Sequence, residues 1–309
     1  MGRTKPRLTN NLHLKIKNTG HFDKARYIGL EFTLDEFDKP VKILDAKQLP
    51  PNHTHGSRKW DRRVVCLIEV SNQYESDAIW ADWGNIRRNR IRNPMVINSF
   101  GGYIGVGVYK PSTDHVVYNK WTHLWMRATE KWRSAYNGVT VSPLWRNFQN
   151  FAKWTYDVSV SNYKPFFHLD KDIFQWYSIN KEYGPDTCVY IPKRLNNYLS
   201  SIPKQKGSTS NMKVKFGKES IYIPSYIYVD GSRMPTLQAC RQYLLQVMIE
   251  MYRKHGYLND RTYGKLVKLN DEIYGMTEED VFKYSDPEIR RKMYNLVERV
   301  ILSDIKNEK

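Results

Sequence analysis

A short stretch near the middle of the chain carries side chains suited to acid–base and metal chemistry. Between Phe166 and Asp172, the residues His168, Asp170 and Asp172 alternate with others, so on a β-strand all three share one face. A neutral imidazole accepts a proton near neutral pH, and carboxylate oxygens are ligands that Mg²⁺ and Mn²⁺ prefer. Phosphodiester hydrolysis uses an ion to neutralise the phosphate and a base to activate water. The residue types therefore suit such a site.

A second stretch is strongly basic. Between Asn85 and Asn93 the chain carries four arginines and no acid: Arg87, Arg88, Arg90 and Arg92. Arginine presents a planar fork that matches phosphate oxygens and guanine edges. Polar and apolar residues alternate, which predicts a strand with Arg88, Arg90 and Arg92 on one face, as a ribbon that follows a phosphate backbone. The alternative is a solvated basic edge that protects a sheet from pairing.

The composition of the whole chain agrees with a polyanionic partner. The 309 residues include 49 Lys and Arg against 32 Asp and Glu, a net charge of +17, and 40% are hydrophobic, enough to build folded cores. Nucleic acid is the usual partner of such a chain, and we expect no membrane association because no long apolar run or lipidation signal is present. We expect no secretory signal, because the first ten residues hold no apolar run. Cys66, Cys188 and Cys240 are widely spaced, which favours buried thiols in the cytoplasm.

Several elements are needed to position these side chains. Short strands broken by Gly and Pro predict a small sheet or barrel from Tyr27 to Trp83. A helical period begins near Tyr118, and Ser142 followed by Pro143 predicts a further helix start. A strand–strand–helix unit is then predicted from a strand at 167–170, a strand at 188–191 and a helix from Pro192 to Leu199.

The last third predicts a basic linker followed by a small α/β region. Residues 203–218 hold five lysines, Lys213 and Lys215 among them, and no acid. Segments 221–223 and 226–229 look like paired strands, and Asp230-Gly231 is a turn signal. Thr236 begins a helix that ends before Gly256, and a helix start at Thr277 precedes a final apolar stripe of Ile289, Met293, Leu296 and Val300.

The central segments resemble the phage branch of HNH, or His-Me finger, proteins. Their motif is a strand ending in Asp-His, a loop, a Pro-Glu-Asn-Leu-like element, a strand, and a helix carrying Asn or His; the corresponding segments are 166–172 and 180–197. The resemblance continues upstream in 118–121, 136–141 and 145–154, and in an N-terminal module at 91–105. Beyond residue 210 the chain resembles only loosely the three-stranded APETALA-type DNA-binding domain.

By position, the resemblance implies that Asp170 is the carboxylate ligand and Asn196 the helix ligand of a divalent Mg²⁺ or Mn²⁺ ion. The base of the family falls at Lys171, and the Asn that orients it falls at Thr187. Both positions depart from the family, because a protonated lysine is a poor base and would instead bind phosphate. His168 is then the alternative base. Expected DNA contacts are completed by Lys193, Arg194, Lys213 and Lys215.

We therefore expect an α+β chain in three parts. These are a basic β-rich module at 1–112, an HNH-like finger with a helical lead-in at 113–200, and a basic linker with a C-terminal α/β DNA-contacting region at 201–309. The expected function is a DNA-binding, metal-dependent endonuclease of phage homing-endonuclease type that acts on double-stranded DNA. The alternatives are a catalytically inactive nucleic-acid-binding protein and a structural or assembly protein on the same finger; metal-dependent turnover separates them.

Overall fold

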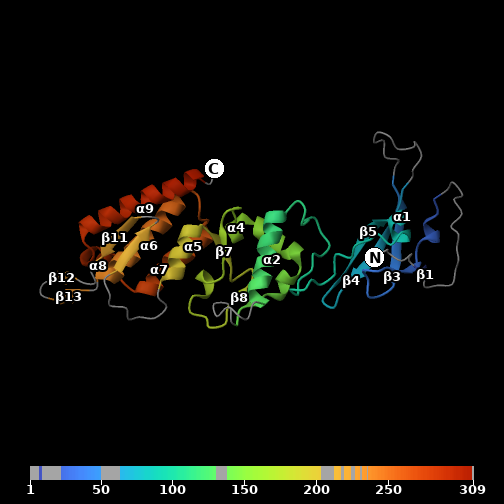
Figure 1. Ribbon diagram of the computed structural model, residues 1–309, viewed down its shortest axis with the longest axis horizontal. Helices are drawn as coiled ribbons and strands as arrows, with labels where there is room; N and C mark the ends of the chain where they lie inside the picture. Colours follow the sequence, from blue (N-terminus) through green and yellow to red (C-terminus); the bar gives the residue numbers. More distant parts are fainter. Residues whose placement is uncertain are drawn as a thin grey trace. The chain divides into compact units, whose positions relative to one another are not determined.

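The computed structural model describes residues 22–49, 63–129, 138–202 and 236–307. It also describes the short strands at 7–8, 212–216, 219–223, 227–229 and 232–234. The chain divides into two compact units (Figure 1). The first comprises Met1–Tyr118 and Pro143–Asn150, and the second comprises Asn119–Ser142 and Phe151–Lys309. The first holds an antiparallel sheet and the second is rich in helices, which confirms the predicted α+β class. The predicted three-part division stays a prediction.

An antiparallel sheet forms the core of the first unit, in the strand order of the sequence. Ile43, Cys66 and Ile68 are fully buried on one face, where Phe32 and Val41 join them. Side chains alternate between buried and more exposed along the central strands, the period-two pattern of a sheet with one covered face. The strands are β1 (Arg7–Leu8), β2 (Glu31–Thr33), β3 (Val41–Gln48), β4 (Val64–Ser71) and β5 (Ser76–Asp82), and a short 3-10 helix, η1 (Lys24–Arg26), precedes β2.

The arginine-rich stretch is not a strand, so that prediction is wrong. It begins in helix α1 (Trp83–Arg87), because the Asp82 carboxylate caps the helix by accepting from the Asn85 amide at 3.1 Å. Asn89 then takes a left-handed conformation with φ 55°, which ends the helix. The predicted alternation survives in an irregular backbone: Asn89 and Ile91 are buried, while Arg87, Arg88, Arg90 and Arg92 are exposed.

The predicted strand–strand–helix unit is present in the second unit. Strand β7 (His168–Asp170) pairs antiparallel with β9 (Val189–Ile191), with Asp170 opposite Val189, and helix α5 (Lys193–Ser201) follows Pro192 directly. Leu195 and Leu199 of α5 are buried, and the helix packs against β7. The preceding elements are α2 (His115–Thr129), β6 (Thr140–Val141), the 3-10 helix η3 (Pro143–Arg146), α3 (Phe148–Tyr156) and α4 (Val158–Ser161); η4 (Ile173–Gln175) and β8 (Glu182–Tyr183) lie between β7 and β9.

The C-terminal strands pair differently from the prediction. Part of the expected linker is strand β10 (Met212–Phe216), which pairs with β11 (Glu219–Ile223), whereas β12 (Ile227–Val229) pairs with β13 (Ser232–Met234). The predicted pairing of 221–223 with 226–229 is therefore wrong, because each segment finds its partner in a separate hairpin.

Four helices complete the second unit. Helix α6 (Thr236–Lys254) packs against α7 (Asp260–Tyr274), α8 (Glu278–Tyr284) and α9 (Pro287–Asn307), and Figure 1 shows α6 and α9 side by side. The predicted ends hold: Gly256 has φ 70°, and Thr277 and Asp280 form a capping box. Of the predicted stripe, Met293 and Leu296 are buried, and Val297, Ile301 and Ile305 extend it.

All three cysteines are buried and unpaired, as the sequence predicts. Burial raises the pKa of Cys66 and of Cys240 to about 12 and also raises that of Cys188. The three thiols therefore stay protonated and weakly nucleophilic near neutral pH. Among the helices in the described ranges, none has both the length and the apolar character needed to cross a membrane.

Candidate functional site

Asp170 closes the turn that leaves β7. Its carboxylate Oδ1 accepts hydrogen bonds from the backbone amides of Asp172 at 2.8 Å and Ile173 at 2.9 Å, which starts η4. The residue is buried, and this burial, together with the neighbouring Asp172 charge, raises its pKa to about 6 in spite of the two amide donors. One oxygen of the predicted metal ligand is therefore already hydrogen-bonded to the local backbone.

Lys171 lies in a buried ion cluster with Asp172 and Lys181. The Lys171 ammonium is 3.1 Å from one Asp172 oxygen, and Lys181 donates to the other. Burial alone would raise the pKa of Asp172, but the charges of the two lysines hold it below its ordinary value. Gln175 fixes the turn by donating to the Lys171 carbonyl at 2.7 Å. Lys171 is therefore placed neither to accept a proton from water nor to reach a phosphate.

The donor set does not fit a Mg²⁺ or Mn²⁺ ion. One Asp170 oxygen accepts two backbone amides, and both Asp172 oxygens face ammonium groups. Over the part of the chain that the structure describes, no three His, Cys, Asp or Glu side chains gather closely enough to hold an ion. Thr187 uses its hydroxyl to close a loop, donating to the Glu182 carbonyl at 2.8 Å.

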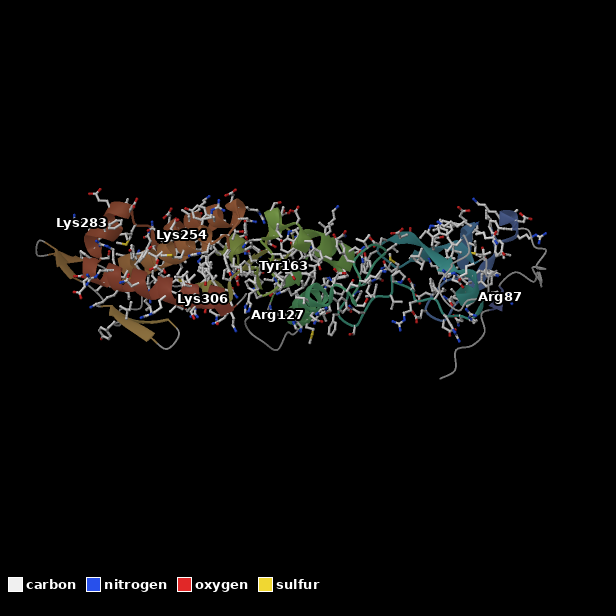
Figure 2. The ribbon with its side chains drawn as sticks, turned by 90° about the horizontal axis from the view of Figure 1, so that it is seen from above. Arg87, Arg127, Tyr163, Lys254, Lys283 and Lys306 are labelled. Atoms are coloured by element: carbon white, nitrogen blue, oxygen red, sulfur yellow. The ribbon has the colours of Figure 1, made fainter. Side chains whose placement is uncertain are left out.

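Three positive charges act on His168 at the other end of β7. Lys120 and Arg127 come from α2, and Lys193 is the first residue of α5. Burial and then the charges of these three residues lower the pKa of His168, so its imidazole is neutral near pH 7. The side chains of His168, Lys120 and Arg127 are partly exposed, and Lys193 is exposed. Figure 2 labels Arg127 on α2. We call these four residues the His168 cluster.

The charges of the His168 cluster are not neutralised within the described chain. None of its three cations forms an ion pair with a described carboxylate. Lys120 is held in place because its ammonium donates to the Phe167 carbonyl at 2.7 Å and lies 5.4 Å from the Tyr190 ring centroid. Burial and Arg127 together lower the pKa of Lys120. Cations assembled without counter-charges attract an anion.

Lys120 and Arg127 are absent from the site residues that the sequence predicts. The available signal is on α2, where Lys120, His123 and Arg127 recur at the spacing of one helical face. The nearness of that face to His168 depends on how α2 packs, which periodicity does not give.

The other residues predicted to contact DNA lie in different surroundings. The Arg194 guanidinium makes two hydrogen bonds to the Asp304 carboxylate, at 2.5 and 2.8 Å, so it ties α5 to α9. We therefore leave Arg194 out of the DNA surface. Lys213 and Lys215 lie on β10, opposite Tyr222 and Ser220, and their side chains are outside the described residues. The four arginines at 87–92 are exposed in the first unit.

The chain matches no protein-family model, no curated protein and no solved structure with which it was compared. The resemblance to HNH proteins stays a prediction that rests on the sequence motif. Two antiparallel strands followed by a helix are the order that this resemblance implies.

Proposed function

We propose that the chain binds double-stranded DNA and that the ββα unit formed by β7, β9 and α5 contacts the phosphate backbone without cleaving it. The observation that carries the proposal is the His168 cluster, in which the charges of Lys120, Arg127 and Lys193, from two helices, act on a neutral imidazole and are paired with no described carboxylate. A phosphate fits this chemistry, because lysine and arginine donate charge-assisted hydrogen bonds to it and the imidazole adds a further donor.

The start of α5 supports a phosphate contact. Lys193 is its first residue, no acid occupies the first turn, and the side chain of the N-cap residue Pro192 makes no capping hydrogen bond. Unpaired backbone amides and the helix dipole favour an anion at such an end. The exposed arginines at 87–92 supply a second basic surface on the first unit, suited to sequence-independent contacts. We place this activity in the cytoplasm, where the three buried thiols stay reduced.

The hydrogen bonds and ion pairs that the carboxylates already make favour DNA binding over DNA cleavage. Asp170 accepts two backbone amides and Asp172 is paired with two ammonium groups, so neither has both oxygens available for an ion. An ammonium in an ion pair, such as that of Lys171, does not act as a general base. The proposal therefore keeps the predicted DNA partner and takes the catalytically inactive alternative.

The binding test compares matched lysine and arginine variants on a short DNA duplex. Arg127→Gln combined with Lys193→Gln removes two expected phosphate contacts, so the log–log salt dependence of the dissociation constant should become shallower by roughly 2. Lys283→Gln is the control, because Lys283 is an exposed lysine on α8, away from α2 in the same unit (Figures 1 and 2). Equal slopes for the double variant and the control would remove the His168 cluster from the interface.

A plasmid-nicking assay with Mg²⁺ and with Mn²⁺ separates binding from cleavage. We expect supercoiled plasmid to stay intact. Nicking that disappears in Asp170→Asn would instead establish the metal-dependent endonuclease. DNA affinity that does not change between about 50 and about 200 mM salt would contradict backbone binding and favour the assembly protein.

A further inference from the structure

Helix α2 has an exposed polar face in the same unit as the His168 cluster. From Asn119 onward the helix belongs to the second unit. Trp121, Leu124 and Trp125 are buried on one side of the helix. Asn119 and His123 are exposed on the opposite side, where their spacing of four residues places them one helical turn apart. This face is therefore open to a partner.

The two cations of α2 lie beside this pair and not within it. At about 100° of rotation per residue, Lys120 and Arg127 fall together on one flank of the exposed face, and Asn119 and His123 fall near its centre. The charges of Lys120 and Arg127 act on His168, so that flank is the one directed to the ββα unit. The face thus has a neutral polar centre with a cationic border.

This arrangement matches the major groove of DNA. No Asp or Glu is present in α2 (His115–Thr129), so no charge on the helix repels phosphate. The major groove is wide enough to admit an α-helix. A helix that lies there contacts base edges from its centre, while cations beside it contact the phosphates. The charge pattern of α2 is therefore complementary to that groove.

Asn119 has the chemistry to distinguish one base from the others. An asparagine amide offers a donor and an acceptor that match the N6 and N7 atoms of adenine. Asparagine is also a poorer helix former than lysine or glutamate at an exposed position. The Asn119 side chain makes no hydrogen bond with the described part of the chain, so the fold gives no structural reason for an amide there.

We propose that α2 lies in the major groove of double-stranded DNA, where Asn119 hydrogen-bonds to an adenine and His123 contacts a neighbouring base. The proposal rests on the DNA binding proposed above and adds sequence preference to it. Lys120, Arg127 and Lys193 hold the adjoining phosphates, which fixes the position of the helix but carries no sequence information.

The first test selects duplexes from a library with randomised central positions, using the full chain. We expect the wild type to enrich a site with an adenine at a fixed position. Asn119→Ala should lose the preference there and bind the enriched duplex about tenfold more weakly, with an unchanged salt dependence because the amide is neutral. Asn295→Ala is the matched control, because Asn295 is an exposed asparagine inside α9.

The second test replaces that adenine by 7-deazaadenine, which lacks the N7 acceptor in the major groove and keeps its Watson–Crick pair and its minor-groove edge. The wild type should bind the modified duplex several-fold more weakly than the unmodified one. Asn119→Ala should bind the two duplexes equally, because it no longer contacts the adenine.

Four results would overturn the proposal and leave the DNA binding in place. These are salt-dependent binding without an enriched site, equal losses in Asn119→Ala and Asn295→Ala, a wild type that ignores the 7-deazaadenine change, and equal affinity for an RNA duplex of the same sequence. The RNA duplex is informative because side chains do not enter its deep, narrow major groove. Affinity that does not depend on salt would instead overturn the DNA binding itself, and the role of α2 with it.

Discussion

Asp170 gives the ββα unit a pH-dependent stability. Its folded pKa, about 6, lies above the ordinary value, so the native state binds the proton more tightly than the unfolded chain does. The associated stability is present below about pH 4 and is lost as the pH rises through about 6. Asp170→Asn keeps an oxygen acceptor without the charge, so its unfolding free energy relative to wild type should rise by up to about 3 kcal/mol over that range. Urea unfolding at several pH values measures this difference.

The control for this prediction is Asp170→Ala. It leaves the amides of Asp172 and Ile173 without their acceptor, so the variant should be less stable than Asp170→Asn at every pH. Stability curves of wild type and Asp170→Asn that run parallel across the pH range would show that the Asp170 carboxylate is not buried as described.

Asp172 neutralises two buried ammonium groups, so its loss is expected to be costly. Asp172→Asn leaves Lys171 and Lys181, each with a side chain 10% exposed, beside one another without a carboxylate. We expect a loss of about 3 to 5 kcal/mol in unfolding free energy. Lys171→Met should cost less, because it leaves the pair between Lys181 and Asp172. Equal losses in the two variants, measured by urea unfolding, would contradict a shared counter-charge.

The sequence indicates some residues of the candidate site and misses others, for identifiable reasons. His168 and Lys193 are recognisable from sequence because each lies beside the motif or in its helix. The sequence does not show that Lys171 is buried. The carboxylate that neutralises it, Asp172, is shared with Lys181, which lies on the far side of a loop. Lys120 and Arg127 are separated from His168 by more than one element, and only packing brings them near it.

At the scale of elements, Asn162 joins three parts of the second unit with one side chain. It ends α4 in a left-handed conformation with φ 59°. Its amide nitrogen donates to the Tyr190 carbonyl of β9 at 2.8 Å and to the Tyr257 carbonyl at 3.1 Å, and its oxygen accepts from the Asn259 amide at 2.8 Å. Because Tyr257 and Asn259 lie between α6 and α7, this residue fastens the helices to the ββα unit.

Two substitutions separate the backbone role of Asn162 from its hydrogen bonds. Asn162→Gly keeps the left-handed conformation without strain and loses three hydrogen bonds, at a cost of roughly 2 to 4 kcal/mol. Asn162→Ala adds the strain of a left-handed alanine, about 1 kcal/mol more. Thermal unfolding should therefore rank wild type above Gly and Gly above Ala. A Gly variant as stable as wild type would mean that the three bonds contribute nothing.

Local patterns predict the elements better than they predict strand partners. The motif strands and α5 follow from apolar runs and a Pro at the helix start, which are local signals. Strand β10 has alternating Met212, Val214 and Phe216, but the intervening lysines gave it the composition of a linker. The predicted turn at Asp230-Gly231 lies outside the described residues; the strand after it, β13, and not the strand before β12, is the partner of β12. Pairing depends on chain segments that compete for one another, which no single segment reveals.

At the scale of the whole molecule, the C-terminal helices are part of the structure that supports the ββα unit. Arg194 of α5 is bound to Asp304 of α9, and the ring of Phe167 lies 5.6 Å from that of Tyr257. Arg261 of α7 donates to the Val160 carbonyl at 2.8 Å and lies 4.4 Å from the Phe174 ring centroid. These contacts lie within one compact unit.

A chain ending at Ile202 should therefore lose the fold of the ββα unit as well as the helices. The deletion exposes the apolar surface of Phe167 that Tyr257 covers and removes the Asp304 carboxylate from Arg194. Hydrogen exchange at the amides of β7 and β9 should become fast, while a chain ending at Asn307, the control, stays protected. DNA binding should retain only the contribution of the exposed arginines at 87–92. Protected β7 and β9 amides in the shortened chain would instead make the C-terminal helices a separate module, attached to a ββα unit that folds without them.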